Sequence, residues 1–286
     1  MAMSFSLAHL TVLGCAPPEA TYIAARTGYD YISLRILMMG LTTEVGNYAL
    51  VENKSMLRKT KAALRETGLQ VHDIELARIH ENVDVTSYEP AFAVAAELGT
   101  RHLICSVWTP DRELALERFV ELCDLAQLYE LTVNLEFVTW AEVANLERAL
   151  ELARAAQRSN VGVLIDTLHF HRSRVRLDEL DGVPPEWCNF VHLCDAPAEL
   201  PKDTESLIFT GRENRLYVGE GGIDIASILN RLPEIPYSVE LPNSARVREV
   251  GYEEHARRCL ESAKTYFAKH PHIRPSVQAS GASAAI

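Results

Sequence analysis

The chain alternates short apolar runs rich in β-forming residues with longer segments of helical periodicity, from residue 5 to residue 269. This alternation is typical of successive βα units in a parallel sheet, which leaves few architectures open. The helical periodicity is clearest over residues 113–130 and 141–157. Eight runs are candidate strands: residues 6–14, 31–38, 71–79, 101–108, 132–138, 161–167, 189–195 and 237–241.

Eight βα units predict a single (β/α)8 TIM barrel, a fold that typically takes about 250 residues. A doubly wound open sheet would show the same alternation, but no GxGxxG motif follows the first strand. Three glycines, Gly28, Gly68 and Gly99, lie where helices should end. We therefore predict a barrel over residues 1–270, followed by a flexible C-terminal tail over residues 271–286, which is small, polar and without periodicity.

Two connections are longer than simple turns: residues 39–55, after the second strand, and residues 196–222, after the seventh. Both follow the carboxyl ends of strands, where barrel enzymes build their active sites. We expect them to be substrate loops or lids.

Charge and cysteine content narrow the function classes. Lysine and arginine number 28 against 39 aspartates and glutamates, a net charge of -11, which disfavours a nucleic-acid partner. The six cysteines form no CxxC pair, which favours reduced thiols and a cytoplasmic protein. No run approaches the roughly 18 to 20 apolar residues of a membrane span, so no membrane association is expected. Homo-oligomerisation stays open.

Four ionisable residues interrupt apolar strands near their carboxyl ends: Glu136, Asp166, His192 and Glu240. The spacings of 30 and 26 positions are each about one βα unit, and the spacing of 48 is one unit enlarged by residues 196–222. One residue from each consecutive strand would therefore converge on the mouth of the barrel.

Any one of these four residues alone would usually be a helix cap, an ion-pair member or a hydrogen-bonded core histidine. Four at one depth favour a shared site, where unpaired carboxylates would cost several kcal/mol and take up protons. Three carboxylates and one neutral imidazole suit Mn²⁺, Mg²⁺ or Co²⁺, and Zn²⁺ is compatible. We predict one divalent metal ion, for which manganese, magnesium and cobalt are all candidates.

With these residues the chain resembles the xylose isomerase-like TIM barrels over about residues 5–269. That superfamily includes sugar-phosphate isomerases and epimerases, ketose 3-epimerases, inosose dehydratases, 3-dehydroshikimate dehydratases and endonuclease IV. The matching motifs are LEF around Glu136, D-x-x-H of Asp166 and His169, H-x-x-D of His192 and Asp195, R-x-x-x-G-x-G of Arg215, Gly219 and Gly221, and VEL around Glu240. They are fairly specific for the superfamily and do not identify the substrate.

The resemblance implies roles beyond metal binding. In members that move protons on sugars, the first and last metal-binding glutamates lie on opposite sides of the reacting carbon, so Glu136 and Glu240 would be acid and base as well as ligands. The metal would stabilise the enolate or enediolate while a carboxylate takes the proton. His169 matches a histidine that contacts substrate oxygen, and Arg215 an arginine that holds a hydroxyl or anionic group. Alternatively, His169 would only cap the loop after the sixth strand, and Arg215 would lie on the outside of a mobile loop.

Two further pairs of residues have an open interpretation. Arg35 and Glu75 are charges inside adjacent apolar strands, where each needs a partner. We favour an ion pair between them, and the alternative is that Arg35 binds a substrate carboxylate or phosphate. Trp108 and Trp140, near the ends of the fourth and fifth strands, would wall a sugar-sized pocket or pack in the core.

The predicted function is a metal-dependent isomerase or epimerase in carbohydrate metabolism, acting on a sugar, sugar phosphate or related polyhydroxy ketone. The main alternative is a lyase, a dehydratase of 3-dehydroshikimate or an inosose, since loss of a β-hydroxyl uses the same metal and base. Several dehydroshikimate dehydratases carry a histidine where this chain has Val138, which disfavours that alternative.

An endonuclease IV-like repair enzyme is least favoured, because the spacing of His9, His72, His80 and His102 does not reproduce its three-metal cluster. A binding protein that retains the metal site is not distinguishable from a slow enzyme.

Overall fold

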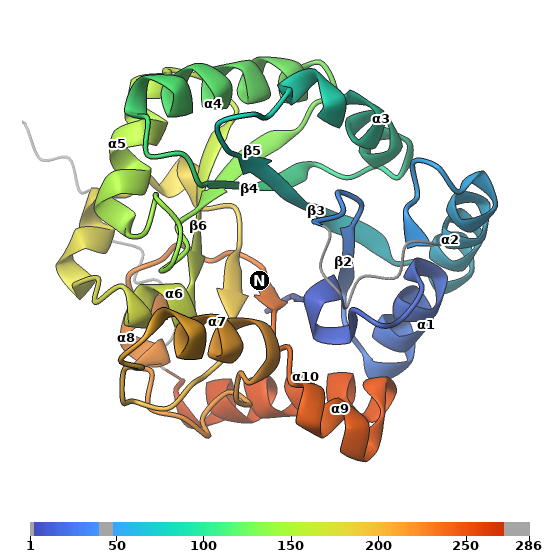
Figure 1. Ribbon diagram of the computed structural model, residues 1–286. Coiled ribbons are helices and arrows are strands. Elements are labelled where there is room, and N and C mark those ends of the chain that lie inside the picture. The colour runs from blue at the N-terminus through green and yellow to red at the C-terminus, as the bar shows by residue number, and fades with distance from the viewer. Residues whose placement is uncertain (1–2, 40–47, 272–286) are drawn as a thin grey trace, which may run out of the picture.

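The computed structural model describes residues 3–39 and 48–271. Its eight parallel strands close into a barrel in sequence order, because β1 pairs with both β2 and β8. Figure 1 shows the strands at the centre and the helices around them. The predicted single (β/α)8 TIM barrel is confirmed. The strands are β1 Phe5–Leu7, β2 Tyr31–Arg35, β3 Gln70–Ile79, β4 His102–Val107, β5 Thr132–Glu136, β6 Val161–Asp166, β7 Val191–Leu193 and β8 Tyr237–Val239.

Helices follow the strands as the periodicity predicted. The helix predicted over residues 113–130 ends at Gln127, and the one predicted over residues 141–157 begins at Leu146. Gly28 and Gly68 adopt left-handed conformations at helix C-termini with φ of 89° and 75°, and Gly99 does so with φ of 75°, as predicted. The α-helices are α1 Pro17–Thr27, α2 Lys54–Thr67, α3 Glu89–Glu97, α4 Arg112–Gln127, α5 Leu146–Ala156, α6 Thr167–Arg172, α7 Thr204–Glu213, α8 Ile225–Leu229, α9 Ser244–Val250 and α10 Tyr252–Lys269. The 3-10 helices among the described residues are η1 His9–Val12, η3 Val85–Tyr88, η4 Leu177–Gly182 and η5 Pro185–Trp187.

The first strand is shorter than predicted. Residues 6–14 were expected to form one strand, but β1 ends at Leu7 and the chain turns into η1. Thr11 holds this turn against the end of β8, since its hydroxyl donates to the Val239 carbonyl and accepts from the Leu241 N–H, both at 2.8 Å. The apolar run therefore continues through a change of backbone conformation that its composition does not reveal.

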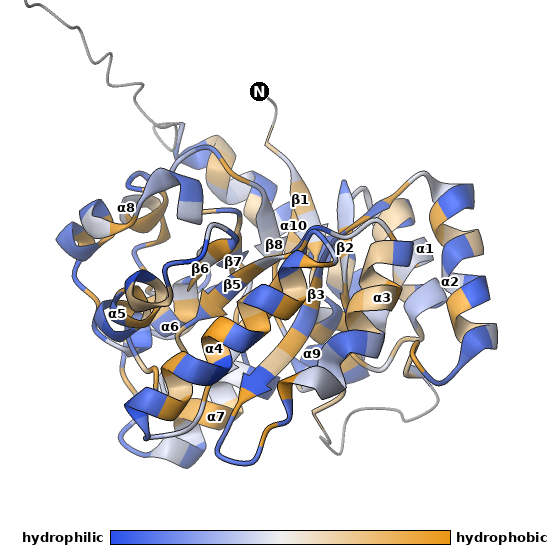
Figure 2. Cartoon of the chain, turned by 90° about the horizontal axis from the view of Figure 1, so that it is seen from above, coloured by the Kyte–Doolittle hydropathy of each residue, from blue (hydrophilic) through white to orange (hydrophobic). Residues whose placement is uncertain are grey.

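The two long connections differ in what the structure describes. Residues 40–47 of the first, and residues 272–286 of the predicted tail, lie outside the described residues. The connection at residues 196–222 contains α7, which lies at the carboxyl end of the barrel (Figure 2). Among the described helices, none is long and apolar enough to cross a membrane.

The core has two parts. The larger lies between the sheet and the helices, and Figure 2 shows hydrophobic and hydrophilic residues interleaved along α4, as expected for a helix with one face on the sheet. The smaller lies inside the barrel, where Ile104, Leu164 and Phe190 form a separate buried cluster with Leu76 packed against it. We call this cluster the axial layer.

A polar cluster lies at the amino end of the barrel, below the axial layer. Asp73 is fully buried; its carboxylate accepts a hydrogen bond from the Ser33 hydroxyl and lies 3.1 Å from Nδ1 of His72. The ring of His72 lies 5.1 Å from that of His102 and 4.9 Å from that of Phe190, measured between centroids. The axial layer thus separates this amino-end cluster from the other mouth of the barrel.

Candidate metal centre

The four predicted ligands converge at the carboxyl end of the barrel. Glu136 and Asp166 are the last residues of β5 and β6, His192 lies within β7, and Glu240 directly follows β8. All four are buried, and one potential ligand atom from each lies within 4.8 Å of the others. The equal depth of these residues in their strands therefore does bring them together.

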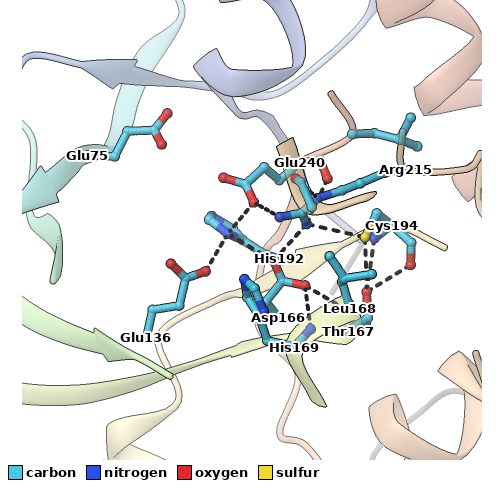
Figure 3. A network of polar contacts seen from close by, with 12 residues as sticks. Glu75, Glu136, Asp166, Thr167, Leu168, His169, His192, Cys194, Arg215 and Glu240 are labelled. Carbon is cyan, nitrogen blue, oxygen red and sulfur yellow. Dashed lines mark hydrogen bonds and ion pairs between the residues drawn. The ribbon is translucent and has the colours of Figure 1, made fainter. Parts of the chain in front are cut away.

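His192 lies at the centre of this group (Figure 3). Its Nδ1 atom is 3.4 Å from Oε1 of Glu136, 3.3 Å from Oε2 of Glu240 and 3.9 Å from Oδ2 of Asp166. Yet both ring nitrogens of His192 and Oε1 of Glu136 are buried without a hydrogen-bond partner among the described residues. Buried polar atoms in native proteins are nearly always satisfied, so these atoms favour a bound ligand between them.

Burial and mutual contact shift the pKa values of three of these four residues. Burial raises the pKa of Glu136 to about 7, although His192 beside it acts in the opposite direction. Burial alone would raise the pKa of Glu240, but His192 and Arg215 outweigh burial and hold that pKa well below its usual range. Burial would likewise lower the pKa of His192, but Glu240 and Glu136 outweigh it and raise that pKa well above 6.5.

Asp166 is held by two kinds of contact. It is the N-cap of α6, and its Oδ1 accepts hydrogen bonds from the N–H groups of Leu168 at 2.6 Å and His169 at 3.4 Å. Its Oδ2 pairs with Nη1 of Arg215 at 2.7 Å. These contacts leave the carboxylate little freedom to rotate away from His192.

Arg215 lies beneath the ligands instead of on the outside of a mobile loop. It is 2% exposed, and its Nη2 is 2.8 Å from Oε2 of Glu240 while Nη1 contacts Asp166. Its Nε donates to the carbonyl of Gly211 at 2.8 Å, which ties the guanidinium to α7. Arg215 therefore contacts two of the four predicted ligands, and its predicted contact with substrate stays a prediction.

Asp195 explains how the chain positions Arg215. Both residues belong to the connection after β7, and Asp195 forms an antiparallel bridge with Leu216. Its buried carboxylate accepts four backbone hydrogen bonds, from Ala196, Gly219, Gly221 and Ile223, at 2.8 to 3.1 Å. A Cβ atom on Gly221 would lie 2.2 Å from the Ala196 carbonyl oxygen, so only glycine fits there. The sequence motif containing these residues thus forms a tightly hydrogen-bonded loop beside the site.

His169 faces the same pocket as the ligands. Its Nδ1 accepts a hydrogen bond from the Thr139 N–H at 3.3 Å and lies 3.1 Å from the Thr139 hydroxyl, while Trp140 packs edge-on against its ring. Burial lowers the pKa of His169 to about 4, so the imidazole is neutral near pH 7. Because Nδ1 accepts, the proton of the neutral ring is assigned to Nε2, which leaves Nε2–H as a donor.

The pocket above the ligands includes the other predicted contact residues. Its described lining contains Glu136, His192, Glu240, His169 and Arg215, together with Arg35, Glu75, Trp108, Val138 and Trp140. The ion pair that we favoured for Arg35 and Glu75 is present, with 2.8 Å between Nη2 and Oε2. Trp108 donates from its indole N–H to the Ser106 hydroxyl at 2.9 Å. The substrate contacts predicted for Arg35 and Trp108 stay predictions.

The donor set fits a divalent cation. Three carboxylates and one imidazole supply hard oxygen and nitrogen donors, and no thiolate lies among the four ligands. Arg215 balances part of the negative charge of Asp166 and Glu240, while the ion-pair partner of Glu136 in the described part of the chain is His192. Glu136, Asp166, His192 and Glu240 could therefore hold one dication, as the sequence predicted.

The described residues contain no second group of three or more potential ligands. His72 and His102 belong to the amino-end cluster, and His9 lies between the Cys15 carbonyl and the Arg35 N–H. His80 is exposed. None of these four histidines belongs to the group of predicted ligands.

A closed (β/α)8 barrel with a buried cluster of ionisable residues at the carboxyl ends of its strands has the arrangement on which barrel enzymes build active sites. The chain belongs to the xylose isomerase-like TIM barrel family, which it matches over residues 22–263. The resemblance that the motifs predicted is thereby confirmed.

Among its relatives are an isomerase and a lyase. An inosose isomerase of Bacillus velezensis is 25% identical over 234 residues, which cover 77% of this chain and 81% of the relative. A 3-dehydroshikimate dehydratase of Pseudomonas aeruginosa is 26% identical over 242 residues, which cover 79% of this chain and 35% of that protein. The solved structure of the IOLI protein with a binding zinc atom has a TM-score of 0.77 at 20% identity, covering 94% of this chain and 99% of the other, and shows a shared fold.

Proposed function

We propose that the protein is a divalent-metal-dependent isomerase or epimerase of a polyhydroxylated ketone or aldehyde. The observation that carries this proposal is the placement of Glu136 and Glu240 on either side of His192, from strands β5 and β8, which are separated in the barrel by β6 and β7. Two carboxylates that face each other across one pocket can exchange protons with opposite faces of one substrate carbon.

The metal would be held by Glu136, Asp166, His192 and Glu240. When bound, it would supply Lewis acidity that stabilises negative charge developing on a substrate oxygen. The zinc atom of the related fold supports a divalent ion in this site, and the four hard donors also suit manganese, magnesium or cobalt.

The side chains around the metal site would then divide the work. One of the two glutamates removes a proton from the carbon next to the carbonyl, and for epimerisation the other returns a proton from the opposite face. The Nε2–H of His169 donates to a substrate oxygen, since its Nδ1 is already used by Thr139. Arg215 keeps Asp166 and Glu240 oriented during this exchange.

The inosose isomerase and the dehydratase among the relatives support enolisation as the shared chemistry. A dehydratase is the second candidate, because its reaction begins with the same proton removal and then expels a hydroxyl. Val138, which lines the pocket, supplies no proton for that expulsion. This apolar side chain favours isomerisation or epimerisation over loss of water.

The experiment is proton exchange in D2O followed by NMR, with manganese-loaded protein and a panel of inososes, ketohexoses, pentuloses and 3-dehydroshikimate. The proposal expects deuterium at one carbon of a ketone and a product of the same mass apart from the label. Loss of water from the labelled substrate would establish the lyase instead. Absence of exchange for every compound in the panel would refute both.

A further inference from the structure

One side of the pocket is formed by the Arg35–Glu75 ion pair, from the neighbouring strands β2 and β3. The two residues are register partners in the sheet, and their side chains are 2% and 4% exposed. Both line the pocket that contains Glu136, His192 and Glu240, although neither belongs to the group of four ligands. The pair is therefore a part of the site that the proposed function has not used.

The two carboxylate oxygens of Glu75 have different surroundings. Oε2 accepts from Nη2 of Arg35 at 2.8 Å, whereas Oε1 is buried and has no hydrogen-bond partner among the described residues. Figure 3 shows the carboxylate pointing into the site from β3, without a contact to the other residues drawn. A buried acceptor left without a donor is costly, so this oxygen favours a donor supplied by a ligand.

The charges around the pocket restrict that ligand. Both buried arginines in the described lining already have carboxylate partners, Arg35 in Glu75 and Arg215 in Asp166 and Glu240. Arg212, which also lines the pocket, is half-buried and has an interaction within the chain. A ligand carboxylate or phosphate would have to displace Glu75 from Arg35, which would leave a buried charge unpaired.

We propose that Glu75 is a specificity-determining residue whose Oε1 accepts a hydrogen bond from a hydroxyl of an uncharged polyhydroxylated ketone, while its pairing with Arg35 excludes anionic ligands from that position. This inference rests on the proposed function, because it concerns the substrate of the same site. It assigns the Arg35–Glu75 pair to substrate selection in addition to its role as an internal ion pair.

The test compares wild-type protein with Glu75→Gln, both loaded with manganese, by calorimetric titration with an inosose and with 3-dehydroshikimate. The glutamine can still offer its oxygen to Arg35, and then presents an NH2 donor where Oε1 was an acceptor. We expect inosose affinity to fall about 10-fold or more, the usual range for a hydrogen bond to a charged group. Affinity for 3-dehydroshikimate should rise several-fold, because Arg35 loses its anionic partner.

Two further variants keep the result interpretable. Glu117→Gln removes a charge from the exposed face of α4 and should leave both affinities unchanged. The double variant Arg35→Met with Glu75→Gln removes both buried charges together, so it should fold even if Glu75→Gln does not. It should lose inosose affinity without gaining affinity for 3-dehydroshikimate.

Several results would overturn the inference. One is an unchanged inosose affinity in the Glu75→Gln variant or in the double variant. Another is an equal loss of affinity for inosose and for 3-dehydroshikimate. A wild-type protein that prefers 3-dehydroshikimate, or that binds neither compound, would also overturn it. Inosose binding that depends on Glu75, without any proton exchange in D2O, would refute the isomerase function and leave the role of Glu75 standing. The two proposals thus fail in different experiments.

Discussion

The two ends of the barrel both bury histidine and carboxylate side chains, but they balance charge differently. At the amino end a single carboxylate, Asp73, accepts from Ser33 and contacts His72. At the carboxyl end three carboxylates surround His192, with Arg215 contacting two of them. The amino-end cluster thus buries one carboxylate, whereas the carboxyl end buries three carboxylates beside one arginine.

The two ends also differ in which buried polar atoms lack a hydrogen-bond partner. In the described part of the amino-end cluster, Nδ1 of His102 lacks a hydrogen-bond partner, but burial lowers the pKa of His102 to about 4 and the ring is neutral near pH 7. At the carboxyl end, the atoms without partners include a carboxylate oxygen of Glu136 and both nitrogens of His192. Buried histidines and carboxylates therefore favour a structural role at the amino end of the barrel and ligand binding at its carboxyl end.

The largest difference between the two ends should appear when one aspartate is removed from each. Asp166→Ala should lower metal affinity by at least about 100-fold, since loss of residues that merely orient ligands already costs 10- to 100-fold. Proton exchange should disappear with the metal. Metal analysis of protein purified without chelator should find close to one ion per wild-type chain.

Asp73→Ala is the control for that prediction, because it removes a buried aspartate from the amino-end cluster. It should reduce the free energy of unfolding and leave metal content near the wild-type value. Equal metal loss in the two variants would mean that Asp166 acts through general stability.

Within the carboxyl end, Glu136→Gln and Glu240→Gln should separate ligation from proton transfer. Each keeps one ligand oxygen but loses the basicity of the carboxylate, so proton exchange should fall about 10²- to 10⁴-fold, more than metal binding does. In D2O, each variant should be most impaired for the stereoisomer whose C–H bond points at the altered residue. Near-normal exchange by both, with metal retained, would make the two residues ligands only.

His169→Ala should have a smaller effect confined to the reaction. His169 lies outside the group of four candidate ligands and its Nδ1 bonds to Thr139, so metal content should stay unchanged. Loss of one donor to a substrate oxygen typically costs about 10²-fold in rate. Metal analysis and proton exchange on one preparation would check this, and parallel loss of both would place His169 among the groups that support metal binding.

The smallest expected effect is a pH dependence of stability at the amino end. The pKa of His102 falls from 6.5 to about 4 in the folded protein, chiefly by burial, with His72 and Arg101 acting in the same direction and Asp73 against it. The unfolded chain therefore binds the proton more readily. The contribution of His102 is fully present above about pH 6.5 and is lost as pH falls toward 4.

His102→Gln should remove that dependence. Between pH 7 and pH 5 the wild-type free energy of unfolding should fall by roughly 1 to 2 kcal/mol more than that of the variant, measured by urea denaturation. Identical pH profiles would show that His102 does not titrate differently in the folded and unfolded chains.

The sequence was sufficient for the fold and for the convergence of the four candidate ligands. Each ligand interrupts an apolar strand near its carboxyl end, and in a closed parallel barrel equal depth means a shared mouth. The end of β1 was missed, because residues 8–14 remain mostly apolar while the backbone turns into η1. Strand composition therefore predicted residue positions better than it predicted strand boundaries.

The supporting contacts were not accessible from sequence. The contact between Arg215 and Asp166 depends on how residues 196–222 fold, and the four backbone hydrogen bonds to Asp195 involve a loop whose register no periodicity reveals. The Arg35–Glu75 pair was predicted, but the separate surroundings of the two Glu75 oxygens needed coordinates. Sequence patterns locate charged side chains; three-dimensional contacts decide which of their atoms remain available.

The axial layer of Ile104, Leu164 and Phe190 also has a kinetic consequence. These three residues are at most 1% exposed, and the ring of Phe190 lies 5.8 Å from that of His192, directly beneath the site. If the protein is the proposed enzyme, substrate and product would exchange through the same mouth of the barrel, and each turnover would begin only after the previous molecule has left. Accumulating product would compete with substrate for the empty pocket, and net conversion would slow well before the substrate is exhausted.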